Sequence, residues 1–127
     1  MGTIKKFEDI EAWQKARDLA KVVYDVTAAG KFSRDFGLRD QMRRAAVSIL
    51  SNIGFERGGD KEFIQFIAVA RGSSAEVRAQ LYVALDQGYV EQKTFDQLSD
   101  STIQISRMLS GLMKYLRTSD YKGRKYK

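Results

Sequence analysis

The chain has 127 residues, a formal net charge of +6, 43% hydrophobic residues and 30% charged residues, a size and composition typical of one globular domain rather than of a disordered or fibrous chain. It contains no Cys and no His, which excludes disulfides, thiolate or imidazole metal ligands, cysteine nucleophiles and catalysis by histidine. It also contains no Pro, which favours long uninterrupted helices.

The first predicted helix begins near Glu8 or Asp9 and runs to about Ala29, with Gly30 as a natural stop. Its apolar positions recur at spacings of three and four residues, which places them on one face of a helix: Trp13, Ala16, Ala20, Val23 and Thr27. The second predicted helix starts around Asp35 and ends at Gly58 and Gly59, with a similar stripe at Leu38, Met42, Ala45, Ile49 and Asn52.

Three polar residues lie on or beside the apolar stripe of the second helix: Ser48, Ser51 and Asn52. A polar residue at a helix seam commonly fixes helix alignment, and we weigh this interpretation above a small ligand site within the bundle. The small residues Gly72, Ser73 and Ser74 in the next helix indicate that helices approach one another closely there.

The third predicted helix has Asp60 as its N-cap and ends at Gly88, with a four-three repeat at Phe63, Ile67, Ala70, Ser74, Val77, Leu81 and Ala84. The fourth opens near Thr94 and carries the clearest stripe, at Phe95, Leu98, Thr102, Ile105, Leu109, Leu112 and Leu116. Both helices have a second apolar row, which includes Phe66 and Val69 on one and Met108, Met113 and Tyr115 on the other. Apolar surface left over by one bundle favours a homo-oligomer.

Short connections between the four segments favour antiparallel neighbours. We therefore predict an all-α fold, an antiparallel up-down-up-down four-helix bundle over residues 1–117, followed by a flexible basic tail over residues 118–127. No apolar run approaches the length of a membrane span, and the first six residues are too short and polar for a signal peptide. We expect a cytoplasmic protein without membrane contact.

Basic residues are concentrated in the second helix and in the tail. Arg39, Arg43 and Arg44 share one side of the helix and are candidates to contact phosphates, together with Arg57. The same arginines are equally suited to a structural ion network with Asp40, Glu56 or Glu76, and we weigh that alternative above direct RNA contact. Both interpretations remain open at this point.

The tail interleaves cations with aromatic residues, a composition suited to phosphate neutralisation and base stacking on single strands. The tail residues predicted to contact nucleic acid are Lys122, Arg124, Lys125, Tyr126 and Lys127. A solubilising extension is the alternative, and contact with an anionic membrane comes third because no Lys-rich amphipathic helix accompanies the tail.

Several short segments, in their order along the chain, resemble the 23S rRNA intervening-sequence protein family. Members of this family are four-helix bundles encoded within bacterial large-subunit ribosomal RNA genes. The segments are residues 7–16, 36–38, 41–53, 61–66, 72–76 and 85–89. The resemblance extends from Phe7 to about Leu116. It implies a four-helix bundle. Relatives of the family include the accessory variability determinant proteins of diversity-generating retroelements, which implies a basic homopentamer that contacts RNA and a reverse transcriptase.

The chain departs from the family pattern at the end of the second helix. The family usually has Pro at the position of Leu50, and usually has Asn-Ile-Ala-Glu-Gly where this chain has Asn52, Ile53, Gly54 and Phe55. A deletion of two residues would rotate the following part of a helix by about 200°. We expect the turn at Gly58 and Gly59 to absorb this change.

The predicted function is therefore a non-enzymatic, homo-oligomeric bundle that binds nucleic acid, with RNA as the expected ligand, and that has no cofactor, no metal and no catalytic residue. The alternative is a protein-interaction scaffold that docks a partner such as a reverse transcriptase and does not bind RNA itself. A helical ribonuclease is disfavoured because the chain lacks the histidines that often serve as base and stabiliser.

Overall fold

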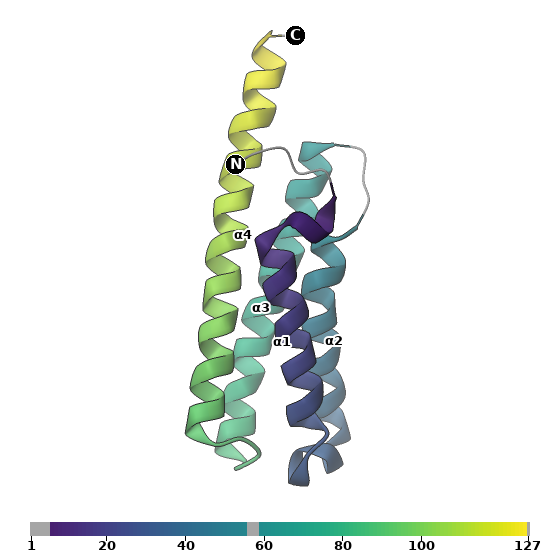
Figure 1. Ribbon diagram of the computed structural model, residues 1–127, viewed down its shortest axis with the longest axis vertical. Helices are drawn as coiled ribbons and strands as arrows, with labels where there is room; N and C mark the ends of the chain where they lie inside the picture. Colours follow the sequence, from purple (N-terminus) through teal and green to yellow (C-terminus); the bar gives the residue numbers. More distant parts are fainter. Residues whose placement is uncertain (1–5, 56–58, 127) are drawn as a thin grey trace.

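The computed structural model describes residues 6–55 and 59–126, with side chains described as far as Thr118. This part of the chain folds into four α-helices and two short 3-10 helices and contains no strand. The elements are η1 (Phe7–Asp9), α1 (Glu11–Thr27), η2 (Gly30–Arg34), α2 (Phe36–Ile53), α3 (Asp60–Asp86) and α4 (Gln92–Tyr126). The helices run alternately up and down (Figure 1), which confirms the predicted antiparallel four-helix bundle.

Helix α2 starts where the sequence predicts, whereas α1 starts later than predicted. Asp35 is the N-cap of α2, and its Oδ1 accepts a hydrogen bond of 3.1 Å from the backbone N–H of Leu38. The first helix begins at Glu11 rather than near Glu8, because Ile10 has an extended backbone and separates η1 from α1. This break lets Ile10 enter the core and lets the ring of Phe7 pack edge-on against Trp13.

The second helix ends at Ile53, earlier than the predicted stop at Gly58 and Gly59. Gly54 follows as the C-cap, and a Cβ atom there would lie 3.1 Å from Phe7 Cδ1 and 3.3 Å from Trp13 Nε1. The close approach of these two rings explains why a small residue stands at this helix end. The turn at Gly58 and Gly59 was expected to absorb the apparent deletion of two residues. This expectation stays a prediction, because residues 56–58 lie outside the described residues.

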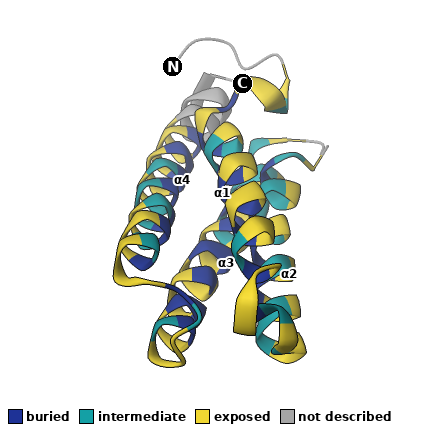
Figure 2. Cartoon of the chain, turned by 60° about the horizontal axis from the view of Figure 1, so that its bottom comes forward, coloured by how far each residue is buried: buried dark blue, intermediate teal, exposed yellow. Residues whose placement is uncertain are grey.

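The predicted stripes of α3 and α4 form a large part of the core. Every residue of the α4 stripe is buried, and so is every residue of the α3 stripe except Phe63, which is partly buried. Figure 2 shows that these buried positions face one another across the bundle. Met113, expected in a second outer row, belongs to the core, whereas Val69 is 53% exposed. Gly59, rather than Asp60, is the N-cap of α3.

Buried hydroxyl groups join α3 to both of its neighbours at mid-length. Ser73 Oγ lies 2.9 Å from Ser48 Oγ of α2, and Ser74 Oγ donates to the backbone oxygen of Thr102 in α4 at 2.9 Å. Ser106 Oγ in turn donates to Ser74 Oγ at 3.1 Å. Ser48 thus makes the predicted hydrogen bond across a helix seam, whereas Ser51 is exposed and takes no part in this seam.

At the lower end of the bundle in Figure 1, the two helix connections are held together by Tyr89. Its ring stacks on Phe32 with centroids 5.1 Å apart, and its hydroxyl donates a hydrogen bond of 3.0 Å to Asp35 Oδ2. This hydrogen bond to the Asp35 carboxylate raises the pKa of the Tyr89 hydroxyl above its ordinary value, with desolvation and the carboxylate charge adding to the effect. The hydroxyl is therefore protonated at neutral pH and remains a donor.

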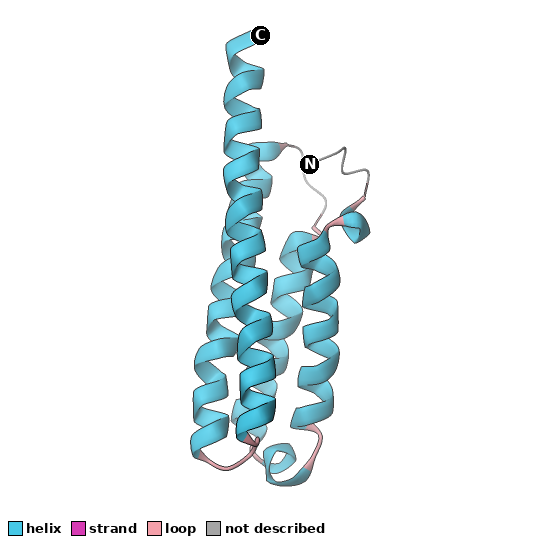
Figure 3. Ribbon diagram, turned by 60° about the vertical axis from the view of Figure 1, so that its left-hand side comes forward, coloured by secondary structure: helices cyan, strands magenta, loops and turns pink. Residues whose placement is uncertain are grey.

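The fourth helix is longer than its sequence pattern indicates. Its apolar stripe ends at Leu116, but the backbone continues as α4 to Tyr126 and extends past the ends of the other helices (Figure 3). The predicted domain boundary after residue 117 stays a prediction, and the side chains from residue 119 onward lie outside the described ones.

The hydroxyl seam leads to a stability prediction. Replacing Ser74 by Ala should lower the free energy of unfolding by about 1–2 kcal/mol, because Thr102 O and Ser106 Oγ lose a buried partner. Ser51→Ala, at an exposed position of α2, is the control and should change it by less than about 0.5 kcal/mol. Urea denaturation followed by circular dichroism measures both. Equal effects of the two substitutions would contradict a structural role for the seam.

Candidate nucleic-acid interface

Three of the predicted phosphate-contacting residues lie in the described part of the chain: Arg39, Arg43 and Arg44, all on α2. The side chains of the other predicted residues, Arg57 and Lys122, Arg124, Lys125, Tyr126 and Lys127, lie outside it. The structure therefore places only the part of the predicted interface that lies on α2. Its three arginines differ in whether they are bonded to other residues of the protein.

Arg39 is held at the start of α2 by three contacts. Its Nη1 donates to the backbone oxygen of Ser33 in η2 at 3.0 Å, and its Nε forms a salt bridge of 2.9 Å with Asp40 Oδ1. Its guanidinium carbon also lies 4.8 Å from the centroid of the Phe36 ring, a cation–π distance. The predicted alternative of a structural ion pair with Asp40 is thus present for Arg39.

Arg43 joins the end of α1 to α2. Its Nε donates a hydrogen bond of 2.8 Å to Oγ1 of Thr27, a fully buried residue, and its Nη2 lies 3.5 Å from the backbone oxygen of Tyr24. A cation at this position also interacts favourably with the negative end of the α1 dipole. The guanidinium carbon lies 4.7 Å from the centroid of the Tyr24 ring. Arg43 is therefore first of all a link between two helices.

Arg44 has a different environment from its neighbour. It is exposed, and within residues 6–55 and 59–118 no side chain forms a hydrogen bond or an ion pair with it. Glu76, one predicted partner of the arginines, instead accepts a hydrogen bond from Gln80 Nε2 at 3.1 Å. Arg44 thus remains available for a ligand.

Exposed aromatic rings accompany the arginines along the edge where α1 meets α2. Phe36 is 62% exposed and Tyr24 is 45% exposed, although each ring is in contact with a guanidinium. A third pair, Arg17 over Trp13 at 5.9 Å, lies farther along the same edge. We call the residues Tyr24, Phe36, Arg39 and Arg43 the α1/α2 edge strip.

The two rings of the strip were not among the residues predicted from the sequence. The pairing of Phe36 with Arg39 could have been found, because residues three apart lie on the same side of a helix. The pairing of Tyr24 with Arg43 could not, because the two residues are 19 positions apart and meet only when α1 packs on α2.

Two exposed cations flank the strip. Lys31 and Arg34 lie in η2, directly before α2. From residue 30 to residue 53 the chain carries five cations against the two carboxylates Asp35 and Asp40, a net charge of +3. Asp40 is paired with Arg39 and Asp35 is bonded to Leu38 and Tyr89, so both carboxylates already have partners. The local excess of positive charge is suited to an anionic ligand.

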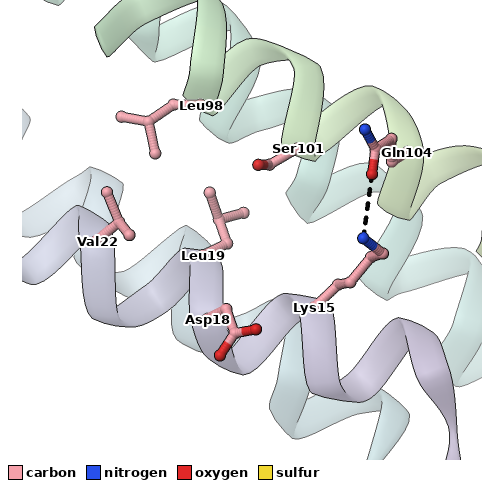
Figure 4. Close-up of a pocket in the computed structure, with 7 residues that line it drawn as sticks. All are labelled: Lys15, Asp18, Leu19, Val22, Leu98, Ser101 and Gln104. Atoms are coloured by element: carbon pink, nitrogen blue, oxygen red, sulfur yellow. Dashed lines mark hydrogen bonds between the residues drawn. The ribbon is translucent and has the colours of Figure 1, made fainter.

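A cavity of about 160 Å³ between α1 and α4 is a second candidate site (Figure 4). Its lining includes Leu19, Val22 and Leu98, with polar groups at the rim. Lys15 Nζ donates to Gln104 Oε1 at 3.2 Å, and Ser101 Oγ donates to a backbone oxygen of its own helix at 3.1 Å. The Lys15 amine and the Ser101 hydroxyl of this cavity are thus both engaged in hydrogen bonds.

The described side chains contain no group of three Asp or Glu residues close enough to share a metal ion. In the same part of the chain, none of the helices is sufficiently long and apolar to cross a lipid bilayer.

The contrast between Arg43 and Arg44 leads to a second stability prediction. Arg43→Ala should lower the free energy of unfolding by about 1 kcal/mol, because it removes the hydrogen bond to Thr27 and the contact with Tyr24. Arg44→Ala, one residue along the same helix, should change it by less than about 0.5 kcal/mol. Thermal denaturation of both variants at the same salt concentration measures the difference. A larger loss for Arg44→Ala would contradict the assigned contacts.

Comparisons with known proteins agree with this architecture. The model of the 23S rRNA-intervening sequence protein family matches residues 8–111. A protein of unknown function from the S23 ribosomal protein family of Bacteroides thetaiotaomicron VPI-5482 has a similar crystal structure, with a TM-score of 0.75 at 17% sequence identity. The similarity covers 81% of this chain and 95% of that chain. At this identity it shows a shared fold. No curated protein matches the sequence.

Proposed function

The chain belongs to the 23S rRNA-intervening sequence protein family, and from this premise and the charge of the α1/α2 edge we propose that it is a non-enzymatic, homo-oligomeric protein that binds RNA. The observation that carries the proposal is the group of exposed cations in η2 and on α2, namely Lys31, Arg34 and Arg44. The cytoplasm is the compartment that we propose for this activity.

Exposed cations without protein partners are suited to phosphate contacts. Arg44 is not paired in the described part of the chain, and no bonded partner of Lys31 or Arg34 is found there either. A lysine or arginine that is free in the protein can release counterions from a nucleic acid without first breaking an internal bond. Arg39 and Arg43 contribute charge to the same surface from fixed positions.

Self-association is the second part of the proposal, and the outer face of α3 supports it. This face is exposed or half-exposed and carries small and apolar residues along its length: Ala68, Val69, Gly72, Ala75, Ala79 and Val83. Apart from the neighbouring backbone of α3 itself, no atom of the described residues lies within 4 Å of the position that a Cβ of Gly72 would occupy, so packing among these residues does not require glycine there. Glycine in a helix interior costs about 1 kcal/mol relative to alanine. Close approach of a second copy would explain it.

The copy number of the assembly rests on the family resemblance alone, and we propose a pentamer on that basis. The alternative function is a scaffold whose basic surface docks a protein partner, such as a reverse transcriptase, and does not bind RNA by itself. The free cations around η2 favour the RNA proposal, since they lie beside exposed rings that a nucleic acid can also contact.

Replacing exposed cations tests RNA binding. The triple variant Lys31→Gln, Arg34→Gln, Arg44→Gln should weaken binding to structured ribosomal RNA and lower the slope of log K against log salt by about 2–3, because each lost phosphate contact removes about 0.7–0.9. The control is Lys93→Gln, Arg107→Gln, Lys114→Gln, which removes the same charge from exposed positions of α4 and should retain the slope. Fluorescence anisotropy over a salt series measures both.

The same titrations include a chain that ends at Arg117 and an unrelated RNA of equal length. A lower slope for the shortened chain would assign phosphate contacts to the tail residues Lys122, Arg124, Lys125 and Lys127. If neither RNA binds in a salt-dependent way, the RNA proposal fails and the scaffold alternative is favoured. Equal losses in the two triple variants would show that total charge, not the α1/α2 edge, determines binding.

Molar mass tests the assembly. Ala75→Glu places a charge on the outer face of α3 and should shift the protein toward the monomer, because the carboxylate would be buried between copies. Gln97→Glu introduces the same group at an exposed position of α4 and serves as the control. Light scattering coupled to size exclusion measures the mass of each. A monomeric wild-type protein at micromolar concentration would contradict the proposed self-association.

A further inference from the structure

We propose that the α1/α2 edge strip binds unpaired nucleotides of RNA, with bases stacking on the exposed rings of Tyr24 and Phe36 while neighbouring cations contact the phosphates. This inference rests on the proposed RNA binding and specifies its ligand, a single-stranded segment rather than a duplex. It is based on ring exposure, guanidinium contacts and the exposed cations near the rings.

Both rings combine a guanidinium contact with a large exposed area. The guanidinium carbon of Arg39 lies 4.8 Å from the Phe36 centroid, and that of Arg43 lies 4.7 Å from the Tyr24 centroid. A large part of each ring nevertheless remains in contact with solvent. Exposed apolar rings of this kind are costly in water, and a base that stacks on the exposed part would cover them.

The cations that contact the rings are themselves fixed by other groups. Arg39 is bonded to Ser33 O and Asp40, and Arg43 is bonded to Thr27 Oγ1. These bonds fix the position of each guanidinium, and the cation–π contact favours a position of the ring against it before a ligand arrives. Binding then requires less ordering of side chains, which is the physical advantage of a preorganised surface.

The exposed ring faces favour an unpaired strand. A base can stack on Tyr24 or Phe36 only if its own face is free. The bases of a duplex are hidden in its stack, whereas unpaired nucleotides can leave their strand's stack and lie on aromatic side chains.

The charge beside the rings identifies the ligand as anionic. Lys31 and Arg34 in η2 lie next to Phe36 in the chain, and Arg44 follows Arg43 on α2. The cation–π contacts found in the described part of the chain all lie on this edge of the bundle. Other exposed aromatic residues, Tyr82 of α3 and Tyr115 of α4, have no such contact and serve as controls.

The test uses the full-length protein and a labelled RNA of about 12 nucleotides without internal pairing, both alone and annealed to its complement. Phe36→Leu and Tyr24→Leu keep apolar bulk but remove the ring. Each should weaken binding of the single strand about tenfold. Binding of the duplex and the salt dependence should not change, because no phosphate contact is lost. Tyr115→Leu should bind both RNAs like the wild type.

Conservative substitutions separate stacking from loss of structure. Phe36→Trp and Tyr24→Phe retain an aromatic face and should restore binding of the single strand to within about twofold of the wild type. Phe36 is an exposed side chain, so a folding defect is not expected, and circular dichroism melting verifies this. A loss that the aromatic substitutions do not restore would overturn the stacking proposal.

The failure of this inference can be distinguished from the failure of RNA binding itself. If the wild type binds the single strand and both leucine variants bind it as tightly as the wild type, the stacking proposal is wrong while RNA binding stands. This conclusion does not depend on how the variants associate with a protein partner. Equal weakening for single strand and duplex would also overturn it. If the wild type binds neither RNA, the proposed function and this inference fail together.

Discussion

The position of α3 between α2 and α4 is the constraint on which the rest of the bundle depends. Its buried hydroxyls meet Ser48 on one side and Thr102 and Ser106 on the other, so a shift of either neighbour along the axis would leave polar groups unpaired in the core. Apolar stripes alone tolerate such shifts more easily, because the hydrophobic effect has no direction. The seam therefore determines how the helix ends align, including the end where η2 presents its cations.

The arginines of α2 include residues held by structural contacts and a residue that is free for the proposed phosphate contact. Arg43 links α1 to α2 through a buried threonine, whereas the adjacent Arg44 is exposed and unpaired in the described part of the chain. A fixed cation and a free cation contribute to the same electrostatic potential, but only the free one can move to meet a phosphate. The two interpretations of these arginines are therefore compatible, because they apply to different residues.

The family comparison establishes the fold more firmly than any activity. A crystal structure with 17% identity superposes over most of the bundle, which shows that the arrangement of helices persists while most side chains differ. Many sequences with the right apolar pattern can fill one such core. Function consequently depends on the exposed residues that each chain places on this scaffold, and the function that we propose for this chain rests on the cations and rings of the α1/α2 edge.

The amino-acid sequence by itself determined the all-α architecture, the buried stripes of α3 and α4, and the family, because apolar periodicity is a local property of a helix. It also indicated the role of Ser48 in helix alignment. Only the tertiary structure decided which cations are free, since the bond from Arg43 to Thr27 and the contact with Tyr24 form between residues distant in the chain. The break at Ile10 was likewise decided by tertiary packing, because Ile10 enters a core built by all four helices and Phe7 and Trp13 lie against Gly54, which is distant in the chain.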